Sequence, residues 1–541
     1  MTTPSLAHRP IRFFHQGRVV EVTGAATTRT VLDWLREDAH CTGTKEGCNE
    51  GDCGACTVVI GELAGAEAGV VDSPTGSPHI DGLSLKTVNA CIQFLPTLDG
   101  KALFTVEDLK AITEDGALHP VQQAMVDCHG SQCGFCTPGF VMSLWSSYER
   151  HREEGGRPSR QQLADELSGN LCRCTGYRPI LDAGQRMFDL PPVRLDTAPV
   201  VRALQDIRNE AGLHYSAQRA MPDGTRTDHF HAPRNLADLA ALVADKPAAK
   251  LLAGSTDIGQ WDNKLMRDVG DLIYVGDVAE LKRIDTVDGT LHIGAAASLE
   301  DAWMALVARH PELQDVWLRF ASLPIRNAGT LGGNIANGSP IGDGAPVLMA
   351  LDAAIVLQHA AQERTLPLRD FYVDYMKSRL EPGEFVQALV VPPLAASWRL
   401  RVYKISKRFD SDISAVCAAL AIDLDGDTVR AARFVYGGMA ATVRHAVQAE
   451  AAVVGKPWTQ DTVSAAMQAL ALDFTPLSDM RASAAYRRRV AANLLQRLWM
   501  ETRTERPLAA DRASVWQLMP HTPVRAPRAA AASGTTLGVT P

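Results

Sequence analysis

The sequence has 541 residues, which is too long for one compact domain and predicts roughly three to five structural units. Apolar residues make up 46% and charged residues 21% of the chain, and this composition excludes disorder throughout. The formal net charge of -8 argues against a nucleic-acid coat or a polybasic membrane tether. We therefore expect a globular multidomain protein with no nucleic-acid partner.

The cysteines are concentrated in one part of the sequence. No stretch is apolar for long enough to cross a membrane, and the first residues, MTTPSLAHRPIRFFHQGR, lack the apolar core of a secretion signal. These features predict a cytoplasmic location. Ten of the 11 cysteines lie within the first 174 residues. Because a reducing compartment disfavours structural disulfides, this distribution predicts metal binding in the N-terminal third.

The first third changes from a mixed pattern to a helical one. Residues 19–22 read as a strand, residues 30–35 as a helix, and KEGCNEGDCGACTVVI as a glycine-rich loop that runs into a strand. From about residue 99 to 188 the period is helical, with a helix that begins at Pro138. We expect a small helical domain to follow a mixed one.

The rest of the chain predicts two further domains. Residues 190–228 are rich in proline and charge and read as a connecting segment. Between residues 233 and 393, strand-like runs such as LIYVGDV alternate with helical patterns such as 236–243. A new pattern then begins and includes a long helix over 486–499. The last residues, rich in alanine and proline, predict a poorly ordered tail.

The first cysteine set has the spacing C-x4-C-x2-C followed by a distant fourth cysteine, which is typical of plant-type [2Fe–2S] ligation. Glycines within this loop allow backbone N–H groups to approach the sulfurs. The predicted ligands are Cys48, Cys53, Cys56 and Cys91.

The second set consists of two short pairs, C-x2-C and C-x-C, at Cys133, Cys136, Cys172 and Cys174. Prolines soon after each pair place helix N-termini beside the cysteines, where they would stabilise an anionic cluster. A second [2Fe–2S] cluster fits this arrangement, and a tetrahedral structural zinc is the alternative. The three remaining cysteines, at 41, 128 and 417, read as small buried hydrophobic residues.

Two glycine-rich loops predict a phosphate-containing ligand, although no Rossmann fingerprint is present. The first, over residues 250–259, is a strand that breaks into a Gly-Ser-Thr turn with donors suited to a pyrophosphate. The second runs from Gly329 to Ile335 and is followed by SPIGD at 339–343. Either loop taken alone is more typical of an ordinary turn.

The strings QCGFCTPG at 132–139 and NLCRCTGY at 170–177 resemble the iron–sulfur part of the xanthine dehydrogenase family of molybdenum hydroxylases. The resemblance extends over about residues 10 to 500. It implies a multidomain α+β protein with a β-grasp [2Fe–2S] ferredoxin domain (9–98), a four-helix [2Fe–2S] domain (99–190) and a linker (191–227). An α+β FAD-binding domain of the vanillyl-alcohol-oxidase type (228–394), a C-terminal α+β flavoprotein domain (395–503) and a tail (504–541) would follow.

The resemblance also implies the residues that hold FAD. It assigns the pyrophosphate to residues 250–257, the ribityl chain to Thr330 through Asn334 with Asp343, and a flavin or adenine contact to Phe320. It adds Val386 and Lys404, and the charged loop KISKRFDSD at 404–412 would border the flavin and influence nicotinamide access. Without the other motifs, that loop reads as a solvated charged turn. The implied FAD residues are Lys250, Leu251, Leu252, Ala253, Gly254, Ser255, Thr256, Asp257, Phe320, Thr330, Leu331, Gly332, Gly333, Asn334, Asp343, Val386 and Lys404.

By the same resemblance, the chain is a small subunit that relays electrons and has no catalytic residue of its own. Molybdopterin would sit on a large partner subunit, with Gln132 approaching it, in a heterotetramer of two small and two large chains. Electrons would pass through the two clusters to FAD and then to NAD while hypoxanthine and xanthine are oxidised to urate. An aldehyde or carbon monoxide dehydrogenase and a stand-alone iron–sulfur flavoprotein reductase are the alternatives. The glycine- and alanine-rich segment 64–82 and the tail are expected to be additions.

Overall fold

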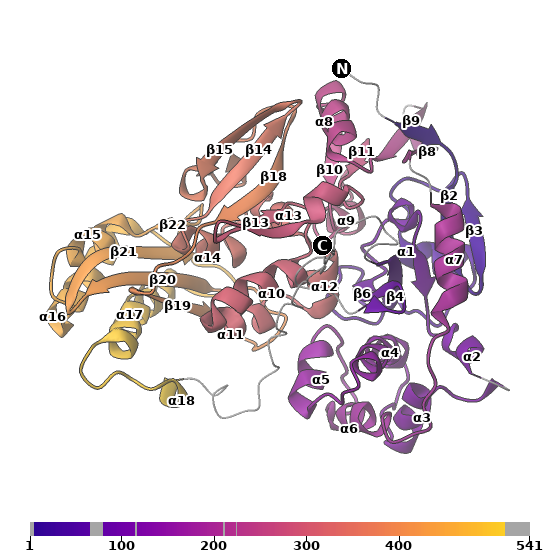
Figure 1. The fold of residues 1–541 in the computed structure, drawn as a ribbon, viewed down its shortest axis with the longest axis horizontal. Helices are drawn as coiled ribbons and strands as arrows, with labels where there is room; N and C mark the ends of the chain where they lie inside the picture. The colour runs from indigo at the N-terminus through magenta and orange to yellow at the C-terminus, as the bar shows by residue number, and fades with distance from the viewer. Residues whose placement is uncertain (1–4, 65–78, 114–115, 209–210, 223, 514–541) are drawn as a thin grey trace, which may run out of the picture.

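The computed structural model describes residues 5–64, 79–113, 116–208, 211–222 and 224–513. Most of the segment 64–82 and of the tail 504–541 lies outside these residues, so the expectations for them are not addressed. Figure 1 shows the N-terminal third, in indigo and purple, beside the central part of the chain, with the C-terminal domain, in orange and yellow, at the far end. Within the described residues, none of the helices is long and apolar enough to cross a membrane.

The first domain is built on a six-stranded sheet with the order β3-β2-β7-β4-β6-β5. Strands β2 and β7 run parallel, and the other neighbours run antiparallel. Thr30 caps the short helix that follows β3, because its Oγ1 accepts a hydrogen bond from the Asp33 backbone N–H at 3.0 Å. The elements are β2 (Ile11–His15), β3 (Arg18–Val22), α1 (Val31–Asp33), β4 (Thr57–Leu63), β5 (His79–Ile80), β6 (Leu83–Asn89) and β7 (Ala102–Phe104).

The helical domain follows, and its helices begin where the sequence predicts. Helix α4 begins at Thr137 and α6 at Arg178, each with a proline in its first turn. The side chains of Phe140, Leu144 and Trp145 on α4 are buried and form part of the core of this domain. The helices are α2 (Leu109–Ile112), α3 (Pro120–Asp127), α4 (Thr137–Glu153), α5 (Arg160–Glu166) and α6 (Arg178–Arg186).

The segment 191–227, expected to be a linker, instead carries regular structure. It contains α7 (Thr197–Ile207), whose Val200 and Leu204 are buried, and β8 (Gly212–Met221), which forms a hairpin with β9 (Gly224–Ala232). The N-terminal strand β1 (Leu6–His8) pairs in parallel with β8, far away in the sequence. Local periodicity could not predict this pairing, because only the tertiary fold brings the two strands together.

The third domain contains two five-stranded sheets, with the orders β1-β8-β9-β11-β10 and β12-β13-β18-β14-β15. A separate two-stranded ribbon joins β16 to β17. The helices are α8 (Leu236–Asp245), α9 (Ile258–Asn263), α10 (Leu299–Arg309), α11 (Gln314–Arg319), α12 (Leu323–Ala328), α13 (Leu331–Ala336) and α14 (Gly344–Ala350). The remaining strands are β10 (Lys250–Leu252), β11 (Leu272–Tyr274), β12 (Ile284–Val287), β13 (Thr290–Gly294), β14 (Ala354–His359), β15 (Gln362–Pro367), β16 (Tyr372–Asp374), β17 (Lys377–Ser378) and β18 (Glu384–Val391).

The C-terminal domain is a four-stranded antiparallel sheet, β19-β20-β21-β22, packed against helices. Strand β20 is buried almost along its whole length because residues of both of its faces are covered. The elements are β19 (Trp398–Ile405), β20 (Val416–Asp425), β21 (Thr428–Gly437), β22 (Arg444–His445), α15 (Val447–Val453), α16 (Gln460–Asp473), α17 (Ala484–Thr502) and α18 (Ala510–Ala513).

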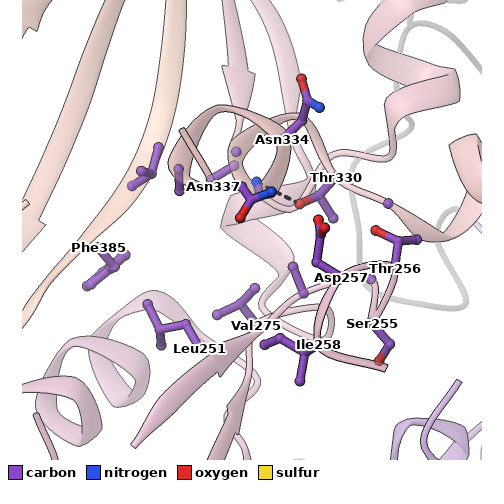
Figure 2. A pocket seen from close by; sticks show the side chains of 18 of the residues that line it. Leu251, Ser255, Thr256, Asp257, Ile258, Val275, Thr330, Asn334, Asn337 and Phe385 are labelled. Atoms are coloured by element: carbon purple, nitrogen blue, oxygen red, sulfur yellow. Dashed lines mark hydrogen bonds between the residues drawn. The ribbon is translucent and has the colours of Figure 1, made fainter. Parts of the chain in front are cut away.

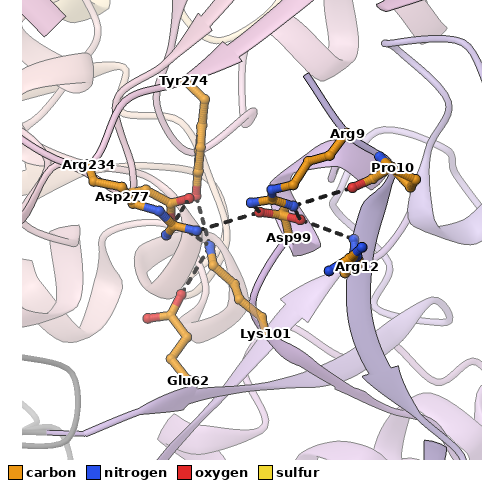
Figure 3. Close-up of polar contacts among 9 residues, drawn as sticks. All are labelled: Arg9, Pro10, Arg12, Glu62, Asp99, Lys101, Arg234, Tyr274 and Asp277. Carbon is orange, nitrogen blue, oxygen red and sulfur yellow. Dashed lines mark hydrogen bonds and ion pairs between the residues drawn. The ribbon is translucent and has the colours of Figure 1, made fainter. Parts of the chain in front are cut away.

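Buried charges join the first domain to the third, as Figure 3 shows. The Lys101 Nζ atom donates to Tyr274 Oη at 3.1 Å and lies 3.1 Å from Glu62 Oε1 and 3.5 Å from Asp277 Oδ1. Arg234 pairs with Asp277 at 3.2 Å. Although burial disfavours its charged form, the neighbouring Tyr274, Glu62 and Asp277 raise the pKa of Lys101 well above its ordinary value. We call Glu62, Lys101, Arg234, Tyr274 and Asp277 the charged seam.

Candidate iron–sulfur and flavin sites

The first cysteine quartet surrounds the loop before β4. The Cys53 backbone N–H donates to Cys48 Sγ at 3.4 Å, and Cys56 and Cys91 are buried. The loop contains Gly51 and Gly54, whose φ angles of 81° and 67° lie in the left-handed region that glycine adopts without strain. The loop is thus folded so that backbone donors turn toward sulfur, as the sequence predicts.

The second quartet lies between the starts of two helices. Cys136 is the N-cap of α4, and the Cys172 sulfur accepts hydrogen bonds from the backbone N–H groups of Cys174 and Thr175, both at 3.4 Å. Although burial disfavours the thiolate, hydrogen bonds from Thr175 and from backbone N–H groups lower the pKa of Cys172. Cys133 and Cys174 are exposed at the surface of the domain.

Within each quartet the thiols are close enough to shift one another's pKa. Cys48 interacts with Cys53, and Cys91 with both Cys48 and Cys56. In the second quartet Cys133 interacts with Cys174, and Cys136 with Cys172. Among the described residues, no group of three or more His, Cys, Asp or Glu side chains is arranged to hold one metal ion. A [2Fe–2S] cluster divides four thiolates between two irons, so it does not require three of these side chains around one metal ion.

The two quartets are linked by a direct backbone contact. The Leu171 backbone N–H donates to the Cys53 carbonyl at 3.0 Å, and Cys172 is the next residue. The buried amide of Asn170 supports this contact by donating to the Gly54 carbonyl at 3.1 Å. Cys53 of the first quartet is therefore connected to Cys172 of the second through one hydrogen bond and the single residue Leu171.

The two glycine loops meet around one cavity of about 260 Å³, and Figure 2 shows side chains from both loops pointing into it. A Cβ atom on Gly254 would lie 1.8 Å from the Ala328 carbonyl oxygen, so the first loop can approach the second only because residue 254 is glycine. Ser255 has a φ of 61°, and Thr330 caps α13 by accepting from the Gly333 N–H at 3.1 Å. The sequence placed these loops together through resemblance alone, and the structure brings them into contact.

A second cavity, of about 340 Å³, lies between the first, third and C-terminal domains. Thr256 lines both cavities. Lys404 Nζ donates to Asp343 Oδ2 at 2.7 Å and to Ser414 Oγ at 2.9 Å in the wall of the second cavity. The Lys404 and Asp343 side chains are only 2% and 3% exposed. This buried pair joins the third domain to the C-terminal domain.

The polar atoms of the first cavity fit a phosphate-containing ligand such as FAD. Ser255 Oγ and Asn334 Oδ1 are buried and have no hydrogen-bond partner among the described residues. Buried polar atoms are normally hydrogen-bonded, and both residues line the cavity, although the Asn334 amide points away from the other lining side chains in Figure 2. Burial also raises the pKa of Asp257, which lines the same cavity. Leu251, Val275 and Phe385 supply the apolar part of the lining.

Most of the residues that the sequence assigned to FAD line one of the two cavities. Those at the first cavity are Leu251, Ala253, Gly254, Ser255, Thr256, Asp257, Thr330, Gly332, Gly333, Asn334 and Val386, and those at the second are Thr256, Phe320, Asp343 and Lys404.

Three of the assigned residues lie elsewhere. The Lys250 Nζ atom donates to the Val269 carbonyl at 2.8 Å, and the Leu252 and Leu331 side chains are buried in core clusters. Alternate residues of a strand point to opposite faces, so Leu251 of β10 reaches the cavity while its two neighbours do not. Gly51 and Asp52 of the first cysteine loop also line the second cavity, which no local sequence pattern indicates.

Comparison with known families assigns a family to each domain. Residues 13–92 match the "2Fe-2S iron-sulfur cluster binding domain" and residues 105–185 the "[2Fe-2S] binding domain". Residues 225–394 match the "FAD binding domain in molybdopterin dehydrogenase" and residues 401–502 the "CO dehydrogenase flavoprotein C-terminal domain". The chain is an iron–sulfur flavoprotein of the molybdenum hydroxylase family. Its four domains confirm the expected fold class.

Curated relatives belong to the same family but are much longer. The chain is 32% identical to the xanthine dehydrogenase of Emericella nidulans over 86% of its own length and 36% of that protein. It is 30% identical to the xanthine dehydrogenase of Calliphora vicina, over 90% of this chain and 38% of the relative. With aldehyde oxidase 4 of Cavia porcellus it shares 28% identity, over 85% of this chain and 36% of the relative. The flavoprotein thus spans little more than a third of the curated relatives that it matches.

A solved structure is similar to half of the flavoprotein. It is carbon monoxide dehydrogenase from Hydrogenophaga pseudoflava, in a form that lacks the Mo-pyranopterin moiety of the molybdenum cofactor. The similarity covers 50% of this chain and 94% of that one at 30% identity, with a TM-score of 0.47. A score this low carries no argument about function.

Proposed function

We propose that this chain is the iron–sulfur and FAD subunit of a xanthine dehydrogenase. Electrons leave a molybdopterin site on a large partner subunit, cross the cluster of the second quartet and then that of the first, and reach FAD and finally NAD. The complete enzyme oxidises hypoxanthine to xanthine and xanthine to urate, in purine catabolism. We place it in the cytoplasm, as a heterotetramer of two small and two large chains.

The observation that carries the proposal is the shared wall between the first quartet and the second cavity. Gly51 and Asp52 belong to the loop that contains Cys48 and Cys53, and they line this cavity together with Lys404. A flavin ring held there would lie directly beside the first cluster. The hydrogen bond from Leu171 to Cys53 connects the first cluster to the second on its other side. Together these contacts support the order second cluster, first cluster, flavin.

The chain's own residues bind and orient the cofactors. When bound, the clusters carry single electrons, and FAD couples them to a two-electron acceptor. We assign Ser255, Thr256 and the backbone N–H groups of the two glycine loops to the pyrophosphate. The buried Lys404 ammonium, fixed by Asp343, supplies positive charge in the flavin cavity. No side chain of this subunit is required to act as an acid or base on the purine.

The surface around the second quartet supports a partner subunit. Cys133 and Cys174 are exposed, and beside them Phe135 is 48% exposed and Tyr177 39% exposed. Exposed apolar residues around a redox centre are typical of a surface that another protein covers. Gln132 lies on the same exposed loop, where it can approach the pterin of the partner.

The choice of xanthine rests on the relatives. Two of the relatives reported above are xanthine dehydrogenases at 30% and 32% identity, and in this chain both cluster domains are fused to the FAD domain. The aldehyde oxidase relative and the carbon monoxide dehydrogenase type of C-terminal domain support a second candidate, an aldehyde or carbon monoxide dehydrogenase. A stand-alone flavoprotein reductase would leave the second quartet, with Cys133 and Cys174 exposed, without a role.

Purification of the native complex tests the proposal. We expect a large molybdenum-containing chain to co-purify and the complex to form NADH from NAD when xanthine is added. Turnover with an aldehyde or carbon monoxide, and none with xanthine, would favour the second candidate. A chain that purifies alone and oxidises NADH fully would contradict the proposed partner.

A further inference from the structure

Helix α12 lies where three domains meet, and in Figure 1 it stands between α10 and strand β6. Toward the first domain, Asn327 Nδ2 donates to the Thr87 carbonyl at 3.0 Å and to Thr87 Oγ1 at 3.2 Å. Toward the helical domain, Pro324 packs on Gly169 so closely that a Cβ there would lie 2.7 Å from Pro324 Cδ. This short helix of the third domain therefore contacts both cysteine-bearing domains.

The same helix forms part of the wall of the second cavity. Ile325 lines that cavity, and a Cβ on Gly51 would lie 3.1 Å from Ile325 Cδ1. Gly51 belongs to the loop of the first quartet. One side chain of α12 thus touches both the first cluster loop and the cavity assigned to the flavin.

A buried arginine anchors α12. Arg326 is 2% exposed, and its Nε donates to Glu300 Oε2 at 2.5 Å while its Nη1 donates to the Phe320 carbonyl at 2.9 Å. Glu300 also accepts a hydrogen bond from Trp317 Nε1 at 3.0 Å, which holds the carboxylate in place. Phe320 lines the second cavity, and Ala321 follows it with a left-handed φ of 52°. Arg326 therefore fixes both the helix and the turn that enters it.

We propose that Arg326 is a positioning residue for electron transfer between the first cluster and the flavin. Arg326 fixes α12 within its own domain and Asn327 holds α12 against the first domain, so that α12 sets the spacing between the first cluster loop and the flavin cavity. Each transfer moves one electron from the reduced cluster to the flavin, and no covalent bond forms or breaks. The inference rests on the proposed relay and adds to it the element that sets this distance.

The geometry explains why a residue remote from both cofactors would affect the rate. Lysine at position 326 keeps the positive charge but cannot bond Glu300 and the Phe320 carbonyl as a rigid fork. The turn at 320–322 and the helix then lose their common anchor. Electron transfer slows as the distance between donor and acceptor grows. We expect Arg326→Lys to slow transfer between cluster and flavin several-fold.

The test uses the full chain with its cofactors and two independent variants, Arg326→Lys and Asn327→Ala. A deazaflavin photoreductant injects single electrons after a flash, and absorbance follows their redistribution between clusters and flavin. Hydrogen–deuterium exchange of residues 320–328 measures the anchoring without any redox chemistry. The matched control is Arg309→Lys, because Arg309 also donates to a carbonyl and a side chain, those of Gly289 and Thr286, but away from α12.

We expect Arg326→Lys and Asn327→Ala to keep the wild-type iron and FAD content and the wild-type cluster EPR spectra. In both variants, electrons should redistribute more slowly and the amides of residues 320–328 should exchange faster. Asn327→Ala removes no buried charge, so it tests the inference even if Arg326→Lys folds poorly. Wild-type redistribution rates in Asn327→Ala, or an equal slowing in Arg309→Lys, would overturn the inference. Absence of any redistribution in the wild-type protein would instead contradict the proposed relay.

Discussion

Replacement of Lys101 by methionine tests the charged seam between the first and third domains. Methionine keeps the length of the side chain but removes the charge, so Glu62 and Asp277 lose the cation at 3.1 Å and 3.5 Å. Removing one partner from a buried ion pair costs about 3–5 kcal/mol. Asp277 keeps Arg234 at 3.2 Å, so we expect a cost near the lower end, about 3 kcal/mol.

Two further substitutions calibrate this value. Tyr274→Phe removes only the 3.1 Å hydrogen bond from Lys101, a bond to a charged group worth about 1.5 kcal/mol. Lys282→Met removes a more exposed cation that lies 3.9 Å from Glu62, and we expect less than about 1 kcal/mol. The predicted order of destabilisation is therefore Lys101→Met, Tyr274→Phe, Lys282→Met.

Urea unfolding of the full chain measures this order. Visible circular dichroism reports the iron–sulfur chromophores, and tryptophan fluorescence reports the folded domains. Both signals therefore monitor unfolding of the variants. A multidomain chain does not always unfold in two states, so the urea midpoints of all variants are compared with the wild type in the same buffer and at the same temperature. If Lys101→Met unfolds within about 0.5 kcal/mol of the wild type, or if Lys282→Met costs as much, the seam does not hold the domains as we argue.

Three further predictions concern the flavin cavity and pH. Asp343→Ala should lower FAD content, because the buried Lys404 ammonium loses its carboxylate; full occupancy at limiting FAD would contradict this role. Gly254→Ala should also lower FAD content, since its methyl would lie 1.8 Å from the Ala328 oxygen and force the two loops apart, and fluorescence of the released flavin measures the loss. Burial lowers the pKa of His231 to about 4, below the ordinary value of 6.5, so its neutral form is favoured in the folded chain. Stability should therefore be full above about pH 6.5 and fall as the pH drops toward 4, and a His231→Phe variant should show a weaker decline in its unfolding midpoint.

The candidate cysteine ligands could be named from sequence because most of their information is local. Cys48, Cys53 and Cys56 lie within one loop, and the prolines at 138 and 179 mark the helix starts beside the second quartet. Spacing and helix-start rules act over a few residues, so they name candidate ligands without any knowledge of the tertiary fold.

The domain contacts could not be predicted in this way. The pairing of β1 with β8, the ion pair between Lys101 and Asp277 and the contact of Ile325 with Gly51 each join residues far apart in the sequence. No periodicity encodes such contacts, since they depend on how complete domains pack. For the same reason the sequence placed the FAD loops together only through resemblance, and it missed the part of the cavity wall that the first cysteine loop supplies.

The relay order is tested most directly by Cys133→Ser in the complete complex, with flavin absorbance as the readout. Serine removes one thiolate of the second cluster, the proposed entry point for electrons from the partner subunit. We expect xanthine to bleach the flavin in the wild-type complex and not in the variant, while NADH bleaches the flavin in both. Normal xanthine-driven bleaching in Cys133→Ser would contradict the relay through the second quartet.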